Sequence, residues 1–151
     1  MMDYNDKYML THDIDWFCVI DGMYVHLASA GGLLPNGFRN KEKLRMQQYC
    51  VANAPFVFKK DEIIYNEDFL NQRFKDNPKG KESYIVTFRE MAQKGFVSMD
   101  RTNLADLLDN HYHLVCYPRK LDRQVLAKIE IPVLNSDENF MLDMSQFRLI
   151  E

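Results

Sequence analysis

The sequence contains no long apolar run and no basic leader. Its most apolar segments, such as WFCVI at 16–20, are far shorter than the roughly 20 residues that a transmembrane helix requires. The first residues, MMDYNDKYMLTHD, show no basic segment followed by an apolar stretch. We therefore expect a protein with neither a membrane span nor a secretory signal.

Cysteine is scarce, and no two cysteines are closely spaced. Cys18, Cys50 and Cys116 stand at unrelated positions and form no C-x-x-C pair. Zinc ribbons and thioredoxin-like redox sites depend on such pairs and are excluded. In a chain without an export signal we expect these thiols to be reduced, which predicts a cytoplasmic protein.

Complete phosphate-binding and nucleophile motifs are also missing. Gly32 and Gly37 have the spacing of a P-loop, but Phe38 and Arg39 stand where that loop needs lysine and serine or threonine. The segment LASAGG supplies only half of a G-x-S-x-G nucleophile elbow, and a long loop rather than a helix follows it. A net charge of −3 gives no general attraction to nucleic acid or to anionic membranes.

The composition is that of an ordinary globular domain. Of 151 residues, 46% are hydrophobic and 27% are charged, and no internal repeat is visible. A chain of this length buries roughly two thirds of its unfolded surface, so a core can form without disulfides or structural metals. We expect one globular domain over residues 1–151.

A β-hairpin is the clearest local prediction. Asp21 and Gly22 stand between two segments rich in β-branched and aromatic residues, which is typical of a two-residue type I′ turn. Because side chains alternate along a strand, this turn also predicts the register and one apolar face. The expected pairs are Ile20 with Met23, Cys18 with Val25, and Trp16 with Leu27.

Capping residues and periodicity predict the remaining elements. Asparagine caps and glycine or proline stops favour helices over 41–53, 67–74, 83–94 and, after Thr102, 103–109. Alternating or apolar segments favour strands near 56–65 and over 96–101, 111–117 and 125–133. Together these elements predict an α+β fold with a mainly antiparallel sheet, an N-terminal β-hairpin and about three or four helices.

The segment DNHYHLVCYPR at 109–119 carries the most chemically suggestive residues. On a regular strand, His111 and His113 share the less apolar face, while Cys116 lies on the opposite, core-facing side. A histidine–cysteine metal cluster therefore fails on geometry. We interpret the two histidines as residues of a solvated or partner-facing strand, and we expect no bound metal and no cofactor. If His113 is exposed, replacing it with alanine should change the free energy of unfolding by less than about 1 kcal/mol.

An alternative keeps these histidines as a catalytic site. If the strand that ends at Asp100 pairs with the histidine strand, Asp100 could lie beside His111 and orient an imidazole, and His26 could join them. His111, His113 and Asp100 would then serve a metal-dependent or acid–base hydrolase. A zinc site needs a third protein ligand, which the spacing alone does not supply.

The loop over residues 30–39 is the preferred binding site. Leu33, Leu34 and Phe38 are large apolar residues in a segment whose glycines and proline prevent regular structure. They either fold back onto the core or form an exposed patch rimmed by Arg39 and Lys41. We favour the exposed patch, so that Leu34→Asp should abolish partner binding and leave the fold intact.

A basic cluster follows this loop. Arg39, Lys41, Lys43 and Arg45 crowd the start of the predicted helix, where the helix dipole disfavours cations. The cluster marks either a site for an anionic group or a solvated surface on which such penalties are screened. A second basic group at 119–123 has no interleaved aromatic residues of the kind that stack on bases. The sequence thus favours a non-catalytic binding module for a protein or a small anionic partner, with the hydrolase as the alternative.

Overall fold

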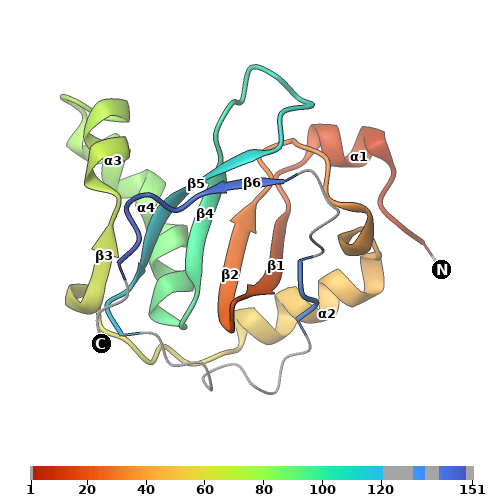
Figure 1. Cartoon of the computed structure of the whole chain (residues 1–151), viewed down its shortest axis with the longest axis horizontal. Coiled ribbons are helices and arrows are strands. Elements are labelled where there is room, and N and C mark those ends of the chain that lie inside the picture. Colours follow the sequence, from red (N-terminus) through yellow and green to blue (C-terminus); the bar gives the residue numbers. More distant parts are fainter. Residues whose placement is uncertain (1, 121–130, 135–139, 149–151) are drawn as a thin grey trace.

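The computed structural model describes residues 2–120, 131–134 and 140–148, which form a six-stranded mixed sheet and four α-helices (Figure 1). The strands are β1 (Asp15–Ile20), β2 (Met23–Ala28), β3 (Ile63–Tyr65), β4 (Val97–Arg101), β5 (His111–Pro118) and β6 (Met141–Asp143). The helices are α1 (Asp6–Thr11), α2 (Lys41–Ala52), α3 (Glu67–Arg73) and α4 (Pro78–Gln93). The α+β class is as predicted.

The sheet is only partly antiparallel. Its order is β1-β2-β4-β5-β3. Strand β6 pairs with the beginning of β5, whereas β3 pairs with the end of β5. The pairs β1–β2, β4–β5 and β3–β5 are antiparallel, whereas β2–β4 and β5–β6 are parallel. The expectation of a mainly antiparallel sheet is therefore corrected. Strands β2 and β4 are parallel because the chain between them, which contains three α-helices, returns to the end of the sheet where β2 begins.

The predicted hairpin register is confirmed. The Cα partners include Ile20 with Met23 and Trp16 with Leu27. Asp21 and Gly22 have φ values of 50° and 77°, both positive as a type I′ turn demands. The hairpin is not the first element, however, because α1 precedes it.

The helix starts follow their asparagine caps. The side chain of Asn40 accepts from the Lys43 backbone N–H, and that of Asn66 accepts from the Phe69 N–H, at the predicted starts of α2 and α3. Helix α4 begins at Pro78, earlier than predicted. Proline is well suited to the first helical turn, where its missing N–H costs nothing, so the helix begins five residues before the predicted start at residue 83.

The predicted short helix over 103–109 is wrong. Residues 102–110 form a succession of turns instead. Three side chains in this segment accept hydrogen bonds from the backbone N–H two residues later: Asn103 from Ala105, Asp106 from Leu108, and Asp109 from His111. Such local bonds compete with helix formation. The predicted strand over 125–133 falls largely outside the described residues; within its described part, Val133 bridges to Val19.

A bulge in β5 reverses one prediction about the histidine strand. Met99 of β4 pairs with Leu114, but Ser98 pairs with Cys116, so Val115 is an additional residue in β5. Cys116 consequently packs with Phe88 of α4, on the same side of the sheet as His113. The expectation that Cys116 points away from the histidine face is therefore wrong, because it assumed an unbroken alternation.

Candidate functional site

The two histidines of β5 lie in different surroundings. His111 is half exposed, with Nδ1 2.6 Å from Asp109 Oδ1. His113 is buried, with Nδ1 3.1 Å from Thr102 Oγ1 and its ring centroid 3.9 Å from that of Phe69 on α3. The expectation of an exposed His113 is wrong because α3 covers this part of the strand. Within the described ranges, no group of three or more histidine, cysteine and acidic residues could hold a metal ion.

Asp100 lies opposite His113 rather than beside His111. The two are Cα partners in β4 and β5, and Asp100 Oδ2 accepts a 2.6 Å hydrogen bond from the Tyr84 hydroxyl of α4. Burial raises the pKa of Asp100 to about 6 and lowers the pKa of His113 to about 4. His113 is thus neutral at pH 7. Its Nε2 is buried without a hydrogen-bond partner among the described atoms.

A second buried polar chain crosses three strands. His26 Nε2 lies 2.8 Å from Asp15 Oδ1, and His26 Nδ1 lies 2.7 Å from Ser98 Oγ. The order of groups is that of a Ser–His–Asp triad, but Ser98 and His26 are fully buried, so no substrate can reach this hydroxyl. The chain ties β1, β2 and β4 together. Sequence reasoning missed it because His26 and Ser98 meet only through the parallel β2–β4 register.

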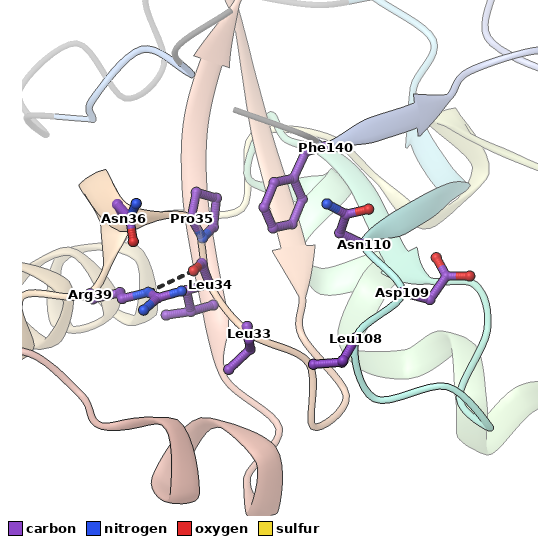
Figure 2. A pocket seen from close by; sticks show the side chains of 9 residues that line it. All are labelled: Leu33, Leu34, Pro35, Asn36, Arg39, Leu108, Asp109, Asn110 and Phe140. Atoms are coloured by element: carbon purple, nitrogen blue, oxygen red, sulfur yellow. Dashed lines mark hydrogen bonds between the residues drawn. The ribbon is translucent and has the colours of Figure 1, made fainter. Parts of the chain in front are cut away.

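A cleft lies at one end of the sheet (Figure 2). Its volume is about 180 Å³. Residues from the 30–39 loop form one side, and residues that precede β5 and β6 form the other. The cleft is lined by Leu33, Leu34, Pro35, Asn36, Arg39, Leu108, Asp109, Asn110 and Phe140.

The predicted binding residues are only partly on this cleft. Leu34 and Phe38 are 1% and 6% exposed, so the expected apolar surface patch is wrong. The loop folds back onto the core, where the Phe38 ring centroid lies 4.9 Å from that of Trp16. Leu33, Leu34 and Arg39 nevertheless line the cleft. Lys41 lies elsewhere, with Nζ 5.6 Å from the centre of the Tyr4 ring.

Arg39 places a positive charge on one side of the cleft. Its Nε donates a 2.7 Å hydrogen bond to the Leu34 carbonyl, which fixes the guanidinium plane (Figure 2). Its ion pair with Asp6 is long, at 3.8 Å, and the Asp6 side chain is 72% exposed while that of Arg39 is 22% exposed. A pair this long and exposed contributes little free energy, so Asp6 holds the guanidinium only weakly. Asn110 and Asp109 lie on the opposite side of the cleft (Figure 2).

Arg101 binds both chain segments that supply the walls of the cleft. This buried side chain donates from Nε and Nη2 to the carbonyls of Ser29 and Ala30 at 2.8 and 2.9 Å. From Nη1 it donates to three carbonyls of the other wall, those of Asn103, Asp106 and Asp109. A Cβ at Gly32 would lie 2.6 Å from Arg101 Cδ and Nε, so glycine makes room for the guanidinium.

The segment that Arg101 holds presents leucines outward. We call residues 102–110 the leucine loop; it projects beyond the ends of β4 and β5 (Figure 1). Leu104, Leu107 and Leu108 are 42%, 46% and 73% exposed. Its carbonyls and acidic side chains meanwhile bond inward to Arg101 and to the loop's own N–H groups. The leucines are thus exposed together with the polar side chains of Thr102, Asn103 and Asp106.

Comparison with protein-family models, with curated proteins and with solved structures found no match. Among the helices that the structure describes, none has the length and apolar character to cross a bilayer.

Proposed function

We propose that the chain is a non-catalytic binding module that engages a protein partner through the leucine loop and the adjoining cleft. One observation carries the proposal: the buried Arg101 guanidinium holds the backbone of a loop whose three leucines face solvent. A preorganised loop loses little conformational entropy on binding.

Burial of the exposed leucines supplies the favourable free energy for binding the partner. Fully burying one leucine side chain contributes about 1.5–3 kcal/mol, and clustered exposed apolar residues mark interaction sites. Leu108 belongs to both the leucine loop and the cleft lining, so one partner can contact both. We place this interaction in the cytoplasm, because all three cysteines are unpaired and reduced thiols are typical of that compartment.

An acid–base hydrolase is the second candidate. The observation that favours it is the Asp100–His113 pair, in which His113 Nε2 has no described hydrogen-bond partner and both pKa values are strongly shifted. Both side chains are almost fully buried, so a substrate would require displacement of Phe69. Hydrolysis of an activated ester by the native chain, abolished in His113→Gln and unaffected in His111→Gln, would support this candidate over the binding module.

The binding module is tested by affinity capture with matched variants. Leu108→Asp changes the most exposed leucine of the leucine loop, and Met46→Asp changes a 69% exposed residue of α2. A specific partner should be retained by the native chain and by Met46→Asp and lost by Leu108→Asp. With that partner purified, Leu108→Asp should raise Kd at least about tenfold. Equal retention by all three proteins would contradict the proposal.

A further inference from the structure

The cleft admits a body of about the size of one residue. Its volume of about 180 Å³ is smaller than the roughly 300–1,000 Å³ of sites for drug-sized ligands. It is close to the roughly 150 Å³ of an apolar cavity that binds a single benzene ring. A partner can therefore insert one side chain or one chain end, but not a longer segment.

The lining combines a cation with apolar walls. Arg39 lies on one side, with its guanidinium plane fixed by Leu34 and with only a long, exposed ion pair to Asp6. Phe140 and Leu108 provide apolar surface within the same small volume (Figure 2). Asn36, Asp109 and Asn110 also line the cleft, and an occupant with a negative group beside an apolar group would match Arg39 and the apolar side chains together. Arginine favours carboxylates, since the planar guanidinium matches their two oxygens.

We propose that the cleft binds the C-terminal residue of the protein partner. Among the residues of a protein chain, the last one carries a carboxylate and a side chain on the same carbon, an arrangement short enough for so small a cleft. The carboxylate pairs with Arg39, and the side chain packs against Phe140 and Leu108. This inference rests on the proposed function, since the cleft adjoins the leucine loop that docks the rest of the partner.

A free amino acid shares this chemistry but adds an ammonium group. The described lining offers that ammonium no free carboxylate, because Asp109 is already engaged by the His111 N–H and by His111 Nδ1, whereas in a chain terminus an uncharged peptide N–H takes the place of the ammonium. N-acetyl-leucine therefore represents a chain terminus, leucine represents the free amino acid, and N-acetyl-leucinamide is the neutral control. The comparison among these three probes requires no variant of the protein.

The experiment is a ¹H–¹⁵N NMR titration of the whole chain with each probe. N-acetyl-leucine should shift the amide signals of Leu34, Leu108 and Asn110, with Kd on the order of millimolar for so few ligand atoms. N-acetyl-leucinamide should bind at least tenfold more weakly. Equal binding of the acid and the amide, or tighter binding of leucine than of N-acetyl-leucine, would overturn the proposal.

Two variants test the role of the cation. Arg39→Gln should weaken N-acetyl-leucine binding at least tenfold, whereas Lys41→Gln, which removes a neighbouring cation outside the cleft, should change it less than twofold. Unchanged binding by Arg39→Gln overturns the assignment. If N-acetyl-leucine does not bind while Leu108→Asp still abolishes capture of the partner, the C-terminal inference fails and the docking proposal stands. If Leu108→Asp captures the partner normally, both fail.

Discussion

Asp100 and His113 are cross-strand neighbours whose pKa values move in opposite directions on folding. Burial raises that of Asp100 to about 6 and lowers that of His113 to about 4. Burial thus disfavours the charged form of each group: the His113 imidazole is neutral at pH 7, and the Asp100 carboxyl takes up a proton below about pH 6. At neutral pH only one of the two groups is therefore charged under α3 and α4. The two shifted pKa values make the free energy of unfolding depend on pH.

The first prediction concerns that dependence. Between about pH 4 and 6, native Asp100 keeps a proton that its unfolded form, with pKa 3.8, releases, so its contribution to stability falls as pH rises. Over nearly the same range unfolded His113, with pKa 6.5, holds a proton that the native form lacks, so its contribution rises with pH. Each effect amounts to about 2–3 kcal/mol, and the two largely cancel.

Single substitutions should separate the two effects. Relative to the native chain, Asp100→Asn should gain stability more steeply between pH 4 and 6, and His113→Asn should lose stability over the same range. Urea unfolding at pH 4, 5 and 6 measures both slopes, and titrating groups elsewhere in the chain are common to all three proteins. Identical slopes in the three proteins would show that the two residues do not titrate as described.

The second prediction concerns Arg101. Arg101→Lys keeps the charge but cannot span the five carbonyls that the guanidinium contacts. Because buried carbonyls then lose their donors, the free energy of unfolding should fall by about 3 kcal/mol. Arg45→Lys, at an exposed position of α2, is the matched control and should stay within about 0.5 kcal/mol. Chemical denaturation decides, and equal effects of the two substitutions would refute the role of Arg101.

The third prediction reverses the sequence-based expectation for Leu34. Since this side chain is 1% exposed, Leu34→Asp buries an unpaired carboxylate and should lower the free energy of unfolding by more than about 3 kcal/mol. Leu108→Asp makes the same chemical change on the leucine loop and should alter stability by less than about 0.5 kcal/mol. Thermal midpoints of the two variants, compared with the native chain, measure the difference. A native-like midpoint for Leu34→Asp would restore the exposed-patch interpretation.

The fourth prediction concerns thiol reactivity. Cys18 and Cys116 are buried, and burial raises the pKa of Cys18 to about 12 and that of Cys116 further. Both should be unreactive in the native protein because the thiolate is the reacting form. Cys50, which is partly exposed, should react with a chromogenic disulfide, and Cys50→Ser should remove this reactivity. Three thiols should react after unfolding; a second reactive thiol in the native chain would contradict the burial.

The parts of the fold that depend on neighbouring residues could be predicted from the sequence. The turn at Asp21 and Gly22 specifies its own register, and the caps at Asn40 and Asn66 specify where two helices begin. In each case the decisive contacts are made within a few residues. The helix prediction for the leucine loop is wrong because Thr102 and the spacing of the leucines favour a helix, while Asx-type bonds and the hydrogen bonds from the preceding residue, Arg101, override that preference.

The candidate site depends on contacts that no local pattern encodes. Arg39 and the leucines of the 30–39 loop were identified, but their neighbours across the cleft, Leu108 and Phe140, come from distant segments. The surroundings of His113 depend on the position of α3, and the side that Cys116 faces depends on the bulge at Val115. A hydrophobic pattern predicts that a residue is buried, but it does not predict which distant residues cover it.

The close approach of Gly32 and Arg101 restricts how this chain can evolve. Any larger residue at position 32 would occupy space that the Arg101 side chain fills, and a shorter side chain at position 101 would leave both loops without their shared donor. A substitution at position 32 is therefore expected to require a substitution at position 101, and the reverse. In homologous sequences the two positions should therefore covary, and a lineage that lost Gly32 should also have lost Arg101 and, with it, the fixed spacing between the two walls of the cleft.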